Sequence, residues 1–102
     1  MNQTISNELY LDLLNGTAKI SWKELELFYA KGKLIHVSVE YDLIDVGIAF
    51  VKDQKQNIEQ LLETKKLVHV TSSMAKSYQL NNTTLWALVI SPWVLIQDIN
   101  KK

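Results

Sequence analysis

The fold is decided by a stretch near the C-terminal end of the chain, which reads Leu85-Trp86-Ala87-Leu88-Val89-Ile90-Ser91-Pro92-Trp93-Val94-Leu95-Ile96-Gln97. It contains two of the three tryptophans and the only proline. Runs this rich in Val, Ile, Leu and Trp, and too short to span a membrane, are typical of strands that are buried on both faces. We therefore expect this stretch to form the central strands of a sheet on which the rest of the chain packs.

The Ser91-Pro92 pair interrupts this stretch. Proline cannot donate a hydrogen bond within a sheet, and the pair lacks the glycine or asparagine that favours a two-residue hairpin turn. We therefore expect one bent strand, or two segments over residues 85–90 and 93–97 that meet at a sharp corner. Either arrangement re-aims the side chain of Trp93.

The rest of the chain alternates between strand and helix patterns. Apolar residues at every second position predict two more strands, and apolar residues at helical spacing predict four helices. A capping box of Ser21 and Glu24 marks the start of one of these helices, and Gly32 follows its end. The expected strands are residues 33–39 and 67–70, and the expected helices are residues 6–14, 22–31, about 58–66, and a last one that follows a cap at Thr71 or Ser72.

Residues 43–52 fit two structures. Ile44, Val46, Ile48 and Phe50 alternate as in a strand, yet the same stretch also places apolar residues along one side of a helix. Asp42 is a suitable N-cap, with a second acid in the first turn. The capping pattern favours the helix.

Size and composition indicate one domain. With 102 residues, 47% of them hydrophobic, the chain can fill a core without disulfides or metals. We expect a single α+β domain over residues 1–102, with helices packed on a small sheet of about three to four strands. A sheet with two apolar faces needs a cover on its second face, supplied either by more helix or by a second copy of the chain.

The charged residues exclude several classes of partner. Eleven lysines balance eleven acids, and arginine and cysteine are absent. Without net charge or arginine, nucleic acid is not expected as a partner. No signal peptide or membrane-spanning segment is evident, so a cytoplasmic location and no membrane partner are expected. A winged-helix DNA-binding domain ranks last among the readings.

Two blocks of sequence resemble a known family. Thr17-Ala18-Lys19-Ile20-Ser21-Trp22-Lys23-Glu24-Leu25, together with Leu85-Trp86-Ala87 and Ser91-Pro92-Trp93-Val94-Leu95-Ile96-Gln97, is similar to DUF2288, a domain of unknown function found in small bacterial proteins. The resemblance runs from about Glu8 to Gln97. The sequence departs from the family's pattern at Gly16, where an acidic residue is usual, and at Gly47, where alanine is usual. The resemblance implies a small bacterial protein and brings no activity or site residues with it.

Few residues suggest chemistry. His36 and His69, the only histidines, lie on two expected strands. If those strands are neighbours, the two imidazoles, with Glu40 or Asp42, offer a weak candidate metal site, although the spacing matches no known motif. We expect no cofactor and assign no catalytic residue, so an enzyme is not the favoured interpretation.

Two functions remain open. The first is a non-enzymatic interaction module, a homodimer that uses apolar strand surface or a sheet edge. The second is a small-ligand-binding protein or an enzyme, with a pocket between the sheet and the helix at residues 22–31 that is lined by Trp22, Tyr29 and Trp93. Tryptophans suit either role, because they supply large apolar surfaces with one polar atom.

Overall fold

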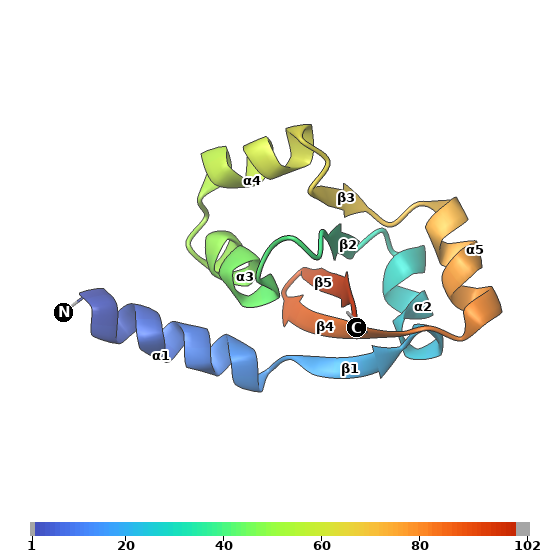
Figure 1. Cartoon of the computed structure of the whole chain (residues 1–102), viewed down its shortest axis with the longest axis horizontal. Coiled ribbons are helices and arrows are strands. Elements are labelled where there is room, and N and C mark those ends of the chain that lie inside the picture. Colours follow the sequence, from blue (N-terminus) through green and yellow to red (C-terminus); the bar gives the residue numbers. More distant parts are fainter. Residues whose placement is uncertain (1, 100–102) are drawn as a thin grey trace.

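The computed structural model describes residues 2–99, with side chains from Asn7 to Ile99. Within that range the chain forms five helices and five strands (Figure 1). In chain order they are α1 (Asn2–Asn15), β1 (Ala18–Ser21), α2 (Trp22–Ala30), β2 (Leu34–Val37), α3 (Leu43–Val51), α4 (Lys55–Glu63), β3 (Leu67–His69), α5 (Ser72–Asn81), β4 (Thr84–Ile90) and β5 (Trp93–Asp98). The expected α+β class is confirmed.

The five strands form one mixed sheet in the order β1-β4-β5-β2-β3. β4 pairs antiparallel with both β1 and β5, β5 pairs parallel with β2, and β2 pairs antiparallel with β3. β5 is the central strand. Its residues Val94, Leu95 and Ile96 are at most 2% exposed, so the prediction of a centre buried on both faces is confirmed.

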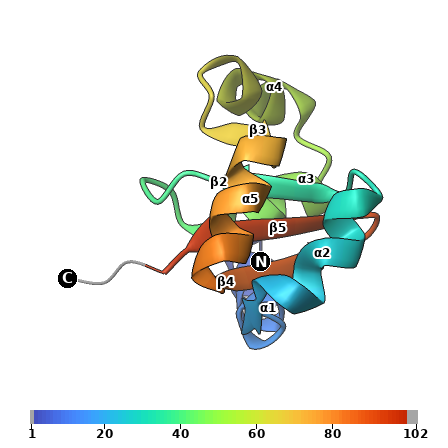
Figure 2. The same ribbon diagram turned by 90° about the vertical axis from the view of Figure 1, so that its right-hand side faces the viewer.

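Helices cover both faces of the sheet. On one face, Trp22 and Leu25 of α2 and Ala75 of α5 pack against alternate strand residues. On the other face, α3 supplies most of the cover, with α1 and α4 beside it. Figure 2 shows α2 and α5 in front of the strands, with α1 and α3 behind them. We call these two sides the α2/α5 face and the α3/α4 face. The second apolar face is thus covered by helices of the same chain.

The expected strand count of three to four is one too low. The four expected strands correspond to β2, β3, β4 and β5, and the additional one is the outer strand β1. β1 has only four residues, and Ala18 and Ile20 are its only apolar ones, so the alternation is too short to predict a strand. Ser21 ends this strand opposite Thr84. Its hydroxyl makes no capping hydrogen bond to α2, so that half of the expected capping box is not formed.

β4 and β5 form a tight hairpin, which corrects the expectation of a bent strand or a sharp corner. Ile90 pairs with Trp93, so the chain reverses over Ser91 and Pro92 alone. The peptide bond between these two residues is cis, the form found in type VI turns, which need neither glycine nor asparagine.

Residues 43–51 form a helix, as the capping pattern favoured. The Asp42 carboxylate accepts a hydrogen bond of 2.8 Å from the Ile44 backbone N–H. Gly47 lies where the helix meets the sheet. A Cβ atom there would come within 2.7 Å of the Leu88 side chain and 3.3 Å of Leu13, so glycine lets α3 lie close to β4 and α1.

Candidate functional site

The structure does not bring the three predicted aromatic residues together. Trp22 and Tyr29 belong to the core of the α2/α5 face, whereas Trp93 packs on the α3/α4 face. The cause is the two-residue period of strand β5. Val94 and Ile96 face α2 and α5, so Trp93 and Leu95 face the other way. A single pocket lined by Trp22, Tyr29 and Trp93 is therefore not formed, because the sheet separates them.

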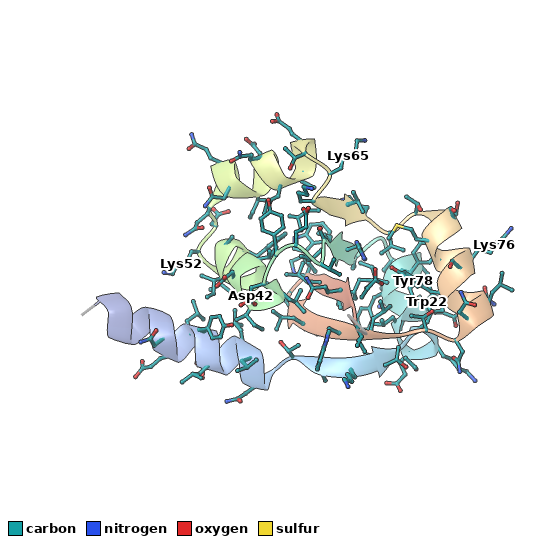
Figure 3. The ribbon with its side chains drawn as sticks, in the orientation of Figure 1. Trp22, Asp42, Lys52, Lys65, Lys76 and Tyr78 are labelled. Atoms are coloured by element: carbon teal, nitrogen blue, oxygen red, sulfur yellow. The ribbon has the colours of Figure 1, made fainter. Side chains whose placement is uncertain are left out.

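Trp22 is a core residue. Its side chain is 2% exposed. Its ring centroid lies 5.7 Å from that of Tyr29 and 5.2 Å from that of Tyr78, both in tilted geometry. Figure 3 shows Trp22 and Tyr78 where α2 and α5 come together. This aromatic cluster joins the two helices, so Trp22 is part of the packing between α2 and α5.

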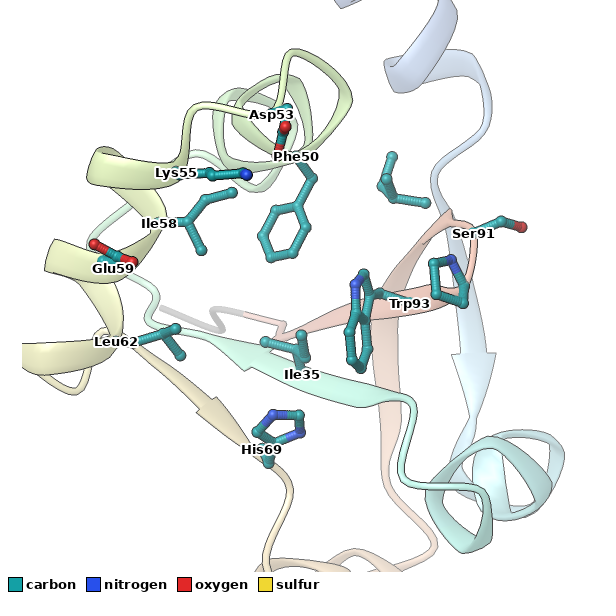
Figure 4. Close-up of a pocket in the computed structure, with 12 residues that line it drawn as sticks. Ile35, Phe50, Asp53, Lys55, Ile58, Glu59, Leu62, His69, Ser91 and Trp93 are labelled. Carbon is teal, nitrogen blue, oxygen red and sulfur yellow. The ribbon is translucent and has the colours of Figure 1, made fainter.

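Trp93 lines a cleft on the α3/α4 face. The cleft has a volume of about 440 Å³ and is open on one side (Figure 4). Its walls come from α3, α4, β2, β3 and the turn between β4 and β5. The lining residues are Ile35, Phe50, Asp53, Lys55, Ile58, Glu59, Leu62, His69, Ile90, Ser91, Pro92 and Trp93. We call this space the Trp93 cleft.

Two aromatic rings face each other across the Trp93 cleft. Phe50 projects from α3 on one wall and Trp93 from β5 on the other (Figure 4). The His69 ring meets the Trp93 ring edge-on at 5.8 Å, and Lys33 Nζ lies 5.4 Å from the centroid of a Trp93 ring. These two neighbours restrict the indole, which also lines the cleft.

Charged side chains surround the mouth of the cleft. Asp53, Lys55 and Glu59 line it. Among the residues that the structure describes, none of these three takes part in an ion pair. Each charge therefore keeps its capacity to bind a charged group of a ligand.

A second hollow of about 400 Å³ lies between α3 and α4. Its lining is mostly polar and includes Tyr41, Asp45, Gln54, Asn57 and Lys66. Burial, and then the charge of Asp42, raise the pKa of the Asp45 carboxyl. Val46, Ala49 and Leu61 add apolar lining, but Tyr41 is its one aromatic lining residue. It therefore offers less flat apolar surface than the Trp93 cleft and is the weaker candidate.

The two histidines lie on opposite faces of the sheet, which corrects the idea of a shared metal site. β2 and β3 are neighbours, as that idea required, but His69 pairs with Ile35 and His36 pairs with Val68. The one-residue difference in phase turns the imidazoles to opposite sides. No group of three or more potential metal ligands occurs within residues 2–99.

His36 belongs instead to a polar cluster on the α2/α5 face. His36 Nε2 lies 3.2 Å from one oxygen of Asp98, and the Tyr78 hydroxyl donates to the other oxygen at 3.4 Å. Burial raises the pKa of Tyr78 above its usual value, and the charge of Asp98 and the hydrogen bond to it add to the effect. Asp98 thus connects α5 to β2. This structural role could not be predicted from the sequence, because His36 and Tyr78 lie far from Asp98 along the chain.

The comparisons with known proteins agree with this fold. The family model "Protein of unknown function (DUF2288)" matches residues 8–98. The chain belongs to this family. A solved structure described as "NMR solution structure of PA1075 from Pseudomonas Aeruginosa" is 38% identical to this chain. The match covers 92% of this chain and 87% of that one, with a TM-score of 0.80. No protein with a curated description is similar. The predicted resemblance to a bacterial family of unknown function is confirmed.

No helix within residues 2–99 is long and apolar enough to cross a membrane.

Proposed function

We propose that the protein binds a small, largely apolar molecule in the Trp93 cleft. The cleft volume of about 440 Å³ falls in the range of roughly 300–1,000 Å³ that is usual for small-molecule sites. Such sites combine apolar walls with a few polar groups that fix the orientation of the ligand. The Trp93 cleft has this composition.

The observation that carries the proposal is the position of Trp93. The indole is held by His69 and Lys33, yet it lines an open cleft and is not enclosed in the core. Trp22, by contrast, is enclosed by α2 and α5. An aromatic ring that is fixed in place and open on one side offers binding surface at low entropic cost.

Chemical-shift mapping tests this proposal. The uniformly nitrogen-15-labelled protein is titrated with a panel of small apolar metabolites while the backbone amide spectrum is followed. We expect a binding compound to shift the amides of Ile35, Phe50, Ile58 and Trp93, and to shift those around Trp22 much less. A panel that leaves the cleft amides unmoved, or that moves only another region, would contradict the proposal.

A variant that fills the cleft gives a second readout. Leu62 lines the cleft and is 42% exposed, so Leu62→Trp should obstruct binding without disturbing the core. Leu80 is 79% exposed and lies on α5, so Leu80→Trp is the matched control. The first variant should weaken binding and the second should not.

Self-association is the second candidate function. The sequence suggested a homodimer because one apolar face of the sheet needed a cover. That argument does not hold, because helices of the same chain cover both faces of the sheet. What favours a homodimer is the outer edge of β1, which pairs with β4 on one side only, together with Leu11 and Leu14 of α1, which are 55% and 46% exposed. A mass of one chain by light scattering at micromolar concentration would count against it.

A further inference from the structure

Phe50 and Trp93 line the Trp93 cleft from opposite walls, and we call the space between them the slot (Figure 4). Trp93 also packs against the core of the α3/α4 face, and its ring lies close to His69 and Lys33. Aromatic rings bind each other in offset-stacked or edge-to-face geometry. Aromatic rings in two walls favour an aromatic ligand, which can stack on one ring or meet it edge-on, over an aliphatic one.

The positive charge near the slot comes from two lysines. Figure 4 shows the Lys55 side chain extending toward the space between Ile58 and Phe50, while the Glu59 carboxylate lies on the far side of Ile58. Lys33 holds a second ammonium over the Trp93 ring. Lys55 lines the cleft itself, whereas Lys33 lies next to the Trp93 ring without lining the cleft.

The Lys55 ammonium has no carboxylate partner in the described part of the chain, although Asp53 and Glu59 are close in sequence. A ligand carboxylate that reaches Lys55 from the slot would gain a charge-assisted hydrogen bond over an apolar floor, where the charge is less screened than at an open surface. Asp53 and Glu59 would disfavour a second negative charge, which limits the ligand to one carboxylate.

From these observations we infer that the ligand of the Trp93 cleft is a planar aromatic monocarboxylate. Its ring lies between Phe50 and Trp93, and its carboxylate binds Lys55. This inference rests on the proposed function and narrows it to one chemical class.

The test uses four probes that differ in one property each. Naphthoate carries the ring and the negative charge, its primary amide keeps the shape without the charge, naphthylmethylamine carries a positive charge, and decalin carboxylate keeps the charge without the flat ring. Dissociation constants are measured from the amide shifts of the cleft residues at an ionic strength of about 0.1 M. We expect naphthoate to bind about fivefold or more tightly than each of the other three, the factor that corresponds to about 1 kcal/mol.

Two variants assign the charge preference to one side chain. Lys55→Gln should bring the affinity for naphthoate down to that for its amide, and should leave the affinity for the amide unchanged. Lys52→Gln is the matched control, because Lys52 follows α3 nearby and does not line the cleft. Its naphthoate affinity should stay within about twofold of the unmodified protein, since the charge is screened over a Debye length of about 8–10 Å.

The outcomes separate the inference from the proposed function. Equal or tighter binding of the amide, the amine or the decalin acid would overturn the aromatic monocarboxylate while leaving the cleft as a small-molecule site. An equal loss of naphthoate binding in both lysine variants would overturn the role of Lys55. If neither these probes nor the metabolite panel shifted any cleft amide, the proposed function itself would fail.

Discussion

The contrast between Trp22 and Trp93 leads to a quantitative prediction. A buried tryptophan removes roughly 150–250 Å² from water, which is worth about 4–6 kcal/mol at about 25 cal/mol per Å². Trp22 is 2% exposed and contacts two tyrosine rings. After allowing for what alanine still buries, Trp22→Ala should lower the free energy of unfolding by about 4–5 kcal/mol. Trp93 borders an open cleft, so water can occupy the vacated space and Trp93→Ala should cost only about 2–3 kcal/mol.

Urea denaturation followed by far-ultraviolet circular dichroism measures both changes on the same scale, without relying on tryptophan emission. The midpoint should fall more for Trp22→Ala than for Trp93→Ala, with similar slopes. Because a domain of this size is stable by about 5–15 kcal/mol, complete unfolding of the Trp22 variant is also consistent. If Trp93→Ala lowered the free energy of unfolding as much as Trp22→Ala, Trp93 would be a core residue, and the proposed binding cleft would be refuted.

Three further predictions concern hydrogen bonds that the structure identifies. The Asp42 carboxylate caps α3 at 2.8 Å and accepts a hydrogen bond from a tyrosine hydroxyl at 2.6 Å. Asp42→Ala should therefore lower the free energy of unfolding, measured by urea denaturation, by about 2 kcal/mol, whereas Thr71→Ala, which loses only a cap, should lower it by about 1 kcal/mol. Equal losses in the two variants would contradict this prediction. Gln97 Nε2 donates hydrogen bonds to the backbone carbonyls of residues 38 and 41, at 2.9 and 2.7 Å. Gln97→Ala should therefore lower the free energy of unfolding by about 1–2 kcal/mol and speed hydrogen exchange of the backbone amides in residues 39–41. Unchanged exchange rates there would refute this prediction. The pKa of Tyr78 is raised in the folded protein. The stability that Tyr78 contributes is therefore present below its unfolded pKa of about 10 and is lost as the pH rises above that value. In Tyr78→Phe the free energy of unfolding should fall less steeply with pH between pH 9 and 11, and an unchanged dependence on pH would contradict this prediction.

Most of the fold could be predicted from the sequence because local patterns determine it. The alternation in β2 and the buried runs of β4 and β5 identify strands, and the Asp42 cap identifies α3. β1 could not be predicted, because Ala18 and Ile20 are the only apolar residues in its run of four, which is too short a pattern to indicate a strand. It becomes a strand only through its pairing with β4, more than sixty positions away.

The candidate site was beyond sequence reasoning for a related reason. Trp93 was recognised as a candidate, but its face of the sheet depends on the phase of β5, and its partners Phe50 and Lys55 come from other elements. The signal that was missed is the stripe formed by Lys55, Ile58 and Leu62 along one side of α4. The same dependence on phase separated the two histidines, since a shift of one residue between paired strands exchanges their faces.

The place of β5 at the centre of the sheet also has a consequence for biosynthesis. Within residues 2–99, the strand that occupies the middle of the sheet is synthesised after the other four, and β4, which joins β1 to it, is made just before. During translation β1 has no partner and β2 can pair only with β3, so the apolar sides of α2 and α3 stay without a platform. The sheet is therefore completed only when the hairpin of β4 and β5 inserts between β1 and β2, which are synthesised well before it.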